Sequence, residues 1–294
     1  MRHASSPIIP VWSGLADNLE GVNGVVCDLW GVLHDGVEAH QNAVQCLINI
    51  RKKDIPVALL SNSPKPINDV WKYLNDLGIP STVADALITS GSIARHLIRK
   101  SYTDQKMYHI GPSARDASTL KGLPVHQVNN IGEADFILCT GLDEPTGEAH
   151  QLTLNVAVEK QIPMICANPD RVVHVRDELQ FCAGVVADVY QSLGGAVIWA
   201  GKPDKLALHS AATVLDLDMD EPSILVIGDS IQTDMAGAES AGYKGILIAS
   251  GIHRDDILPK LKGESVSREL LAKILHKRSL SIPALESIMP NLIW

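Results

Sequence analysis

Apolar and polar residues follow two different rhythms along the chain. Short runs of consecutive apolar residues occupy 24–28 and 56–61, and each is followed by a longer stretch with apolar residues at helical spacing, at 40–53 and from Ser63 to Leu77. Continuous apolar runs of about four to eight residues are typical of strands buried on both faces. Their alternation with helices predicts an α/β fold with a mostly parallel sheet. Ser63 is the predicted N-cap of the second helix, which has prolines in its first turn.

The same alternation continues through the middle and last parts of the chain. Thr89 and Ser90 open a predicted helix, and predicted strands at 106–111, 135–141 and 163–168 follow, with helical stretches between them. A last group of elements begins near Ala200. It comprises a helix at 203–215, a strand at 223–229, a helix at 233–242, a strand at 243–250, a helix near 267–277 and an apolar strand or arm that ends at Trp294.

The composition is that of a globular protein with a substantial core. The chain has 294 residues, 46% of them hydrophobic, and a mean hydropathy of +0.09, which suits one large domain or two modest ones. No apolar stretch approaches the roughly 18–20 residues that cross a bilayer, so we expect no membrane segment. The formal charge of −9 argues against nucleic acid and acidic membrane surfaces as partners.

The cysteines and the N-terminal residues favour a cytoplasmic protein. The start of the chain has no apolar run long enough for a signal peptide. The cysteines form no CxxC motif and mostly sit inside apolar runs, which favours buried reduced thiols. They are Cys27, Cys46, Cys139, Cys166 and Cys182.

Three aspartates stand near the ends of predicted strands. Asp28 follows the apolar run at 25–27, Asp229 follows the run at 224–228, and Asp234 comes at the start of the next predicted helix. Open α/β sheets bind ligands at the carboxyl ends of their strands, and clustered carboxylates suit a hard cation such as Mg²⁺. Taken singly, Asp28 is equally explained as a turn residue and Asp234 as an acid at a helix N-terminus.

Two further residues lie between these acids in the sequence. Ser61 ends the second predicted strand, and Lys202 lies in the segment Ala-Gly-Lys-Pro-Asp. Alone, the first is explained as a turn residue or helix cap and the second as a surface lysine. Together, the order of acid, hydroxyl, lysine and acid pair at strand ends resembles the signature of the haloacid dehalogenase (HAD) superfamily over most of the chain. This resemblance implies a Rossmann-like parallel-sheet core.

The resemblance also implies a role for each residue. Asp28 is the expected nucleophile, which attacks phosphorus and forms an aspartyl phosphate. Ser61 and the backbone N–H of Asn62 are expected to donate hydrogen bonds to phosphoryl oxygens, and Lys202 to neutralise charge beside them. The expected Mg²⁺ ligands are Asp28, the backbone carbonyl of Trp30, Asp229 and, directly or through water, Asp234.

The motif residues fall only in the first and last parts of the chain. We therefore expect an inserted α/β cap domain at 87–198 within a discontinuous core of 1–86 and 199–294. A cap at this point is similar to those of the class IIA, NagD-like hydrolases, which are often buried in dimers, so a homodimer is expected.

The predicted cap contains an Asn-Pro-Asp loop that resembles one in the NagD-like proteins. By this analogy Asn168 and Asp170 face the substrate, although the tripeptide also suits a plain β-turn. Arg171, His174 and Arg176 follow the loop and are candidates to meet an anionic leaving group.

One position departs from the family pattern. Trp30 stands two residues after Asp28, where the phosphatases that the chain resembles usually carry a second Asp as general acid and base. Losing such help costs about 10²–10⁴ in rate, and indole cannot exchange a proton at neutral pH. Three explanations stay open: His34 or Asp35 transfers the proton, the enzyme is slow or prefers good leaving groups, or the site binds phosphate without turnover.

We therefore expect a Mg²⁺-dependent phosphatase that hydrolyses a small phosphomonoester, such as a sugar phosphate or a nucleotide. The first alternative is a phosphometabolite-binding protein with little or no turnover. A bulky aromatic residue after the nucleophile is also similar to the metal-independent branch that hydrolyses C–X bonds. The intact acid pair, Asp229 and Asp234, argues against that branch.

Overall fold

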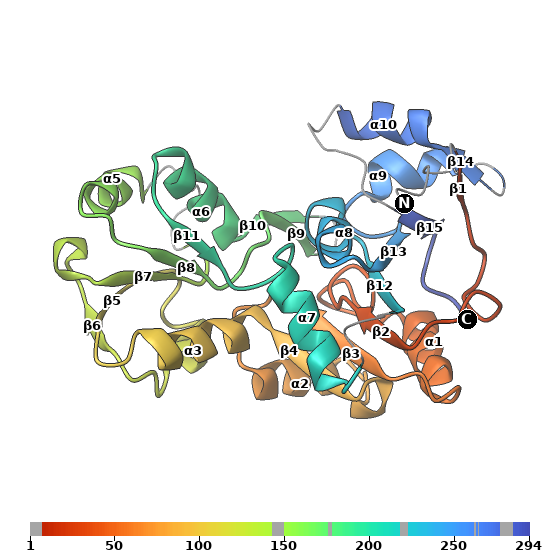
Figure 1. Ribbon diagram of the computed structural model, residues 1–294, viewed down its shortest axis with the longest axis horizontal. Helices are drawn as coiled ribbons and strands as arrows, with labels where there is room; N and C mark the ends of the chain where they lie inside the picture. Colours follow the sequence, from red (N-terminus) through yellow and green to blue (C-terminus); the bar gives the residue numbers. More distant parts are fainter. Residues whose placement is uncertain are drawn as a thin grey trace.

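Two parallel sheets divide the molecule into two α/β halves (Figure 1). The computed structural model describes residues 8–142, 150–175, 178–217, 223–261, 263, 265–276 and 285–294. The half at the right of Figure 1, which we call the core, is built from both ends of the described chain, and the half at the left, the cap, from its middle. The α/β fold with a parallel sheet predicted from the sequence is confirmed.

The core sheet has six strands, all parallel. The chain moves outward through β2, β3 and β4, and later returns beside β2 to continue outward in the other direction. Ile227 pairs with Cys27 at this reversal, which is where open parallel sheets bind ligands. In spatial order the strands are β15 (Leu285–Met289), β13 (Lys244–Ile248), β12 (Ile224–Gly228), β2 (Gly24–Cys27), β3 (Val57–Ser61) and β4 (Ala86–Thr89).

Helices cover both faces of the core sheet because its strands are apolar on both faces. Val25 and Cys27 face one hydrophobic cluster, and Val26, between them, faces the other. The first cluster is closed by α1 (Gln41–Arg51) and α2 (Ile67–Asp76), and the second by α7 (Lys205–Val214) and α8 (Ala236–Ala241).

The cap sheet has five parallel strands and its own two hydrophobic clusters. In spatial order the strands are β11 (Val197–Trp199), β8 (Met164–Cys166), β7 (Phe136–Cys139), β5 (Lys106–Ile110) and β6 (His126–Val128). One face packs on α5 (Gln151–Glu159) and α6 (Ala183–Ser192), and the other on α3 (Ser90–Ser101). A separate antiparallel pair, β9 (Val172–Val175) and β10 (Glu178–Phe181), extends from this half to the core.

The remaining elements are short and mostly belong to the edge of the core. A two-stranded antiparallel sheet joins β1 to β14, far apart in the sequence. These elements are β1 (Ile8–Pro10), α9 (Arg254–Ile257), β14 (Ser265–Ser267) and α10 (Arg268–His276), with α4 (Ala117–Leu120) in the cap.

The predicted strands agree with the observed strands to within about two residues. Two predicted helices begin at other residues than the observed helices do. The helix expected from Ser63 begins at Ile67, with Pro66 as its extended N-cap, because a proline disfavours helical backbone at the residue before it. The helix expected at 233–242 is a π-helical turn (Ile231–Met235) followed by α8. The helix predicted at Thr89-Ser90 is confirmed, since Thr89 caps it through a reciprocal bond pair with Ser92.

The predicted domain boundaries fall inside strands. Residues 87–89 complete β4 in the core sheet, and Trp199 pairs with Cys166 in the cap sheet. The five cysteines are all buried free thiols, as predicted. Within the described residues, no helix has the length and hydropathy to cross a bilayer.

Candidate active site

Three buried carboxylates meet where the core sheet reverses direction. Asp28 directly follows β2, Asp229 follows β12, and Asp234 comes from the π-helical turn after β12. Their exposed fractions are 8%, 6% and 1%, and one oxygen from each lies within 4.8 Å of the others. Gly31 makes this approach possible: its φ is +79°, and a Cβ there would collide with the Asp229 carboxylate.

Lys202 lies inside this cluster. Its Nζ donates to Asp28 Oδ1 at 2.5 Å and to Asp234 Oδ1 at 2.6 Å. Burial by itself would lower the pKa of Lys202, but the carboxylates of Asp234 and Asp28 outweigh burial and raise it. Lys202 therefore stays charged, and its position is fixed by two hydrogen bonds.

One ammonium cannot neutralise three carboxylates. Burial raises the pKa of Asp28, Lys202 lowers it and Asp234 raises it again, which leaves it at about 7. Burial and the neighbouring Asp28 and Asp234 also raise the pKa of Asp229. With all three acids ionised, two negative charges remain in a buried site, and all the side-chain donors are oxygens. Both properties fit a hard divalent cation.

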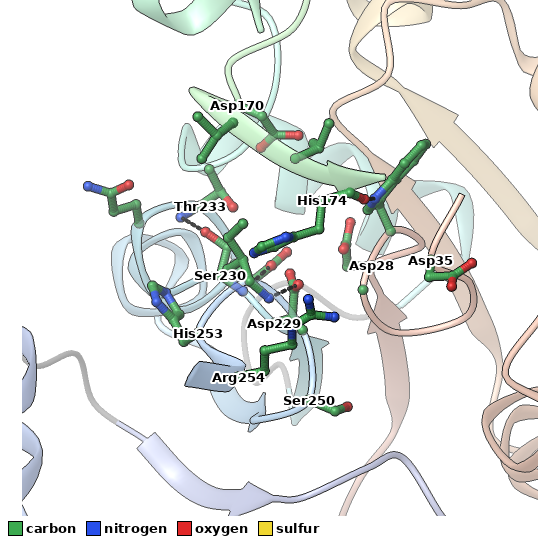
Figure 2. A pocket seen from close by; sticks show the side chains of 18 of the residues that line it. Asp28, Asp35, Asp170, His174, Asp229, Ser230, Thr233, Ser250, His253 and Arg254 are labelled. Atoms are coloured by element: carbon green, nitrogen blue, oxygen red, sulfur yellow. Dashed lines mark hydrogen bonds between the residues drawn. The ribbon is translucent and has the colours of Figure 1, made fainter. Parts of the chain in front are cut away.

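A cavity of about 380 Å³ lies over the cluster, between the core and the cap. The core contributes Asp28, Lys202 and Asp229 to its wall, and the cap contributes Asp170 and residues of β9. Figure 2 shows β9 crossing above the carboxylates, with the His174 side chain pointing into the cavity. The candidates His174 and Arg171 therefore both line the cavity, and the Arg171 guanidinium also pairs with Asp188 at 2.8 Å. The candidate Arg176 lies outside the described residues.

Three of the predicted residues do not line the cavity. Ser61 ends β3 and is buried, and its Oγ accepts from the Ser63 N–H at 3.1 Å. Asn168 orients its own loop by accepting from the Asp170 N–H at 3.3 Å. The Asn62 side chain joins core to cap: it donates to Asp170 Oδ1 at 2.9 Å and accepts from the Lys202 N–H at 2.9 Å. Their roles toward a substrate stay predictions.

The sequence interpretation missed the residues that follow β13. His253 and Arg254 line the cavity from the start of α9, and Figure 2 shows Arg254 extending toward Asp229. His253 is 4% exposed, and its Nε2 accepts from the Ile231 N–H at 3.2 Å, at the start of the π-helical turn. The signal was available, because β13 neighbours β12 and its carboxyl end lies at the same edge of the sheet.

Neither residue suggested as a substitute proton donor has a suitable environment. His34 is buried without lining the cavity, and burial together with His40 lowers its pKa to about 4. Asp35 lines the cavity, but its Oδ1 accepts from the N–H groups of Val37 and Glu38. Burial would raise the Asp35 pKa, but these two bonds outweigh it and lower the pKa. Near neutral pH His34 is therefore neutral and Asp35 ionised, so neither is an acid that could protonate a leaving group.

Comparisons with known proteins agree with this architecture. Residues 25–123 match a family described as haloacid dehalogenase-like hydrolases, and residues 199–272 match one described as HAD-hydrolase-like. The acid sugar phosphatase of Staphylococcus haemolyticus is 26% identical over 80% of this chain and 88% of its own. The ribonucleotide monophosphatase NagD of Escherichia coli is 26% identical over 80% of this chain and 91% of its own.

A solved structure extends the likeness to nearly the whole chain. The haloacid dehalogenase-like hydrolase of Brucella suis superimposes with a TM-score of 0.80 at 29% identity, over 96% of this chain and 100% of that one. The family matches lie on the segments that carry Asp28, Ser61, Lys202, Asp229 and Asp234. The chain therefore belongs to the haloacid dehalogenase-like hydrolases and, among them, to the NagD-like enzymes of class IIA.

Proposed function

We propose that this protein hydrolyses a small phosphomonoester through an aspartyl phosphate formed on Asp28. The observation that carries the proposal is the buried cluster of Asp28, Asp229, Asp234 and Lys202 beneath the cavity between core and cap. Phosphoryl transfer needs a positioned nucleophile and compensation of the charge on the phosphoryl oxygens, with little covalent chemistry from the protein. The phosphatase names of the relatives support this reaction class.

We propose Mg²⁺ as the cation of this site. Asp28, Asp229, Asp234 and the carbonyl of Trp30 would hold it. When bound, Mg²⁺ would offset the negative charge that a phosphate adds to the site. The chain itself supplies Lys202, which holds Asp28 in place and carries a buried positive charge beside it.

The reaction proceeds in two displacements at phosphorus. An Asp28 carboxylate oxygen bonds to phosphorus as the bond from phosphorus to the leaving oxygen breaks, and the leaving oxygen departs with the electron pair. A water oxygen then bonds to phosphorus, the bond to Asp28 breaks, and inorganic phosphate leaves with Asp28 restored as a carboxylate. We keep from the family resemblance the proposal that Ser61 and the Asn62 N–H donate to phosphoryl oxygens, although neither residue lines the cavity. The Asn62 side chain fixes the backbone of Lys202.

The leaving oxygen departs without help from a carboxylic acid in the nucleophile loop. Trp30 replaces that acid, and neither His34 nor Asp35 substitutes for it. The rate should therefore fall steeply as the leaving group becomes more basic, so that aryl phosphates turn over faster than alkyl phosphates. This is the second of the three explanations left open by the sequence.

One assay separates this function from the two alternatives. The purified protein is incubated with p-nitrophenyl phosphate and a panel of sugar phosphates, nucleotides and glycerol phosphates, with Mg²⁺ or EDTA. Phosphate release that needs Mg²⁺ and is lost in Asp28→Asn supports the phosphatase. Saturable binding of a panel compound with no release would favour the binding protein, and hydrolysis of a haloacid in EDTA would favour the C–X hydrolase.

Assembly and location are also proposals. We propose a homodimer in the cytoplasm with a small phosphorylated metabolite as partner. Light scattering across a dilution series tests the first of these, since a monomer at all concentrations would exclude it.

A further inference from the structure

Trp30 makes a contact that the family's Asp could not make. Its indole Nε1–H donates to the backbone carbonyl of His174 in β9, at 2.5 Å. Trp30 belongs to the loop after the nucleophile and His174 to the cap, 144 residues away in the sequence. A carboxylate only accepts hydrogen bonds when ionised, so it could not donate to a carbonyl. The substitution therefore exchanges a proton-transfer group for a bond between core and cap.

The nucleophile loop is shaped around the Trp30 ring. Gly36 lies against it with a φ of +91°, and a Cβ there would come within 2.5 Å of Trp30 Cζ2. The His34 ring meets Trp30 edge to face, with centroids 5.0 Å apart, and accepts from the Gly36 N–H at 3.1 Å. Tyr73 from α2 closes the arrangement by donating to the Gly36 carbonyl at 2.8 Å. The indole is therefore held in one orientation.

Strand β9 is joined to the core at both ends. Asp170, which precedes it, accepts from Asn62 at 2.9 Å, and His174 accepts from Trp30. Between these two points Val172 and Val173 line the cavity above Asp28, as Figure 2 shows for the course of the strand. The first bond fixes one end of the cavity roof, and the second fixes the other.

We propose that Trp30 is a positioning residue that holds β9 over the nucleophile, and that this bond sets the size of leaving group that the closed site accepts. The inference rests on the proposed function for its second half only. With the bond present, β9 stays close to Asp28 and small leaving groups fit. Without it, the roof of the cavity is held at the Asp170 end alone and bulkier groups enter.

The test compares Trp30→Phe with a matched Trp71→Phe. Phe keeps an aromatic ring in the loop and removes the N–H, and Trp71 is a tryptophan of α2 packed on the core cluster away from the cavity. Amide hydrogen exchange in Mg²⁺ buffer should be several-fold faster over Val172–Val175 in Trp30→Phe and unchanged in Trp71→Phe. Equal exchange rates in wild type, Trp30→Phe and Trp71→Phe would contradict the proposal that this hydrogen bond holds β9.

Kinetics test the selectivity. We would measure kcat and KM for p-nitrophenyl phosphate and the bulkier 4-methylumbelliferyl phosphate, whose leaving groups are both acidic phenols. In Trp30→Phe the kcat/KM ratio should shift toward the bulkier substrate by about three- to tenfold, mainly through KM, the range expected for one lost hydrogen bond. Faster exchange with an unchanged ratio would overturn the selectivity and leave the bond standing.

A second variant separates the effect of ring position from the effect of the N–H group. Gly36→Ala should give the same shift with the N–H retained, because the added Cβ displaces the ring. An identical ratio in Gly36→Ala and wild type would count against the role of ring position. If wild-type protein releases no phosphate from either substrate, the proposed function fails, while the exchange measurement still decides on the bond.

Discussion

Core and cap both carry buried acids where their parallel sheets reverse direction. The charge of these acids is compensated in the cap and only partly compensated in the core. In the core, three buried acids share one lysine at the reversal between β2 and β12. In the cap, the reversal lies between β5 and β7, and the buried Asp116 lies beside it. Arg115 donates twice to Asp116 at 2.8 Å, and Thr140 donates at 2.7 Å.

The contrast shows what turns a sheet edge into a site. Topology alone brings side chains together at the carboxyl ends of parallel strands, and it does so in both halves. Asp116 is fully satisfied, and Lys65 of the core adds a second cation 3.8 Å away, so this acid fastens the cap to the core. The core acids have charge left over, which a cation and a phosphate can use.

The largest effect is expected from Asp28→Asn. The amide is isosteric but cannot act as a nucleophile toward phosphorus, so turnover of p-nitrophenyl phosphate should fall by about 10⁴-fold or more. Asp35→Asn is the control, because Asp35 lines the same cavity and an amide oxygen can still accept its backbone bonds. It should retain activity within about threefold. Comparable losses in both variants would contradict the role of Asp28.

Asp116→Asn should destabilise the protein without weakening metal binding. The amide loses charge beside Arg115 and presents donors to donors, at a cost of about 2–3 kcal/mol in the free energy of unfolding. Urea unfolding of this variant and of Asp188→Asn provides the measure. Asp188 also binds an arginine twice, but its side chain is 45% exposed, so its loss should cost under about 1 kcal/mol. Equal costs would remove the distinction between the two pairs.

In metal-free protein Asp229→Asn should raise the free energy of unfolding, whereas Asp116→Asn lowers it. Removing one of the uncompensated charges should stabilise the fold by about 1 kcal/mol in EDTA, since an amide oxygen can still accept from the Ile252 N–H. Adding Mg²⁺ should raise the melting temperature of wild type and leave this variant unchanged. A variant less stable than wild type in EDTA would show that the acids are not in excess.

The smallest effect concerns Asp85, a partly exposed and compensated acid. Burial would raise its pKa, but bonds from Arg51 and the Val57 N–H outweigh burial and lower it. Its contribution is therefore present above the ordinary carboxyl value of about 4 and is lost as pH falls through the lower, folded value. Because the Asp85 side chain is 37% exposed, Asp85→Asn should lower the free energy of unfolding in urea by only about 0.5 kcal/mol at pH 7, and by less at pH 3. A cost independent of pH would mean that charge is not involved.

Much of the core was predictable because short local runs of apolar residues are enough to predict its strands. The runs that end at Asp28, Ser61 and Asp229 are apolar on both faces, and such runs have few alternatives to buried parallel strands. Parallel strands then bring their carboxyl ends together without further information. The cluster of acids therefore followed from strand ends alone, before any packing was known.

The missed features depend on contacts between distant segments. The hydrogen bond of Trp30 requires the position of β9, which no local pattern near Trp30 encodes. The hairpin of β9 and β10 itself was missed, since its residues are partly exposed and lack the apolar run of a buried strand. The start of α2 was misplaced for a local reason, because two prolines overrode the capping preference of Ser63.

The division of the core between both parts of the chain also bears on its biosynthesis. As the chain leaves the ribosome, β2 can pair with β3, but its other edge stays bare until β12 arrives, about two hundred residues later. An exposed strand edge invites pairing with other chains. A nascent or truncated protein that ends in the cap would thus carry Asp28 with no partner acids and an open sheet, which makes it a substrate for chaperones and proteases before it can bind a cation.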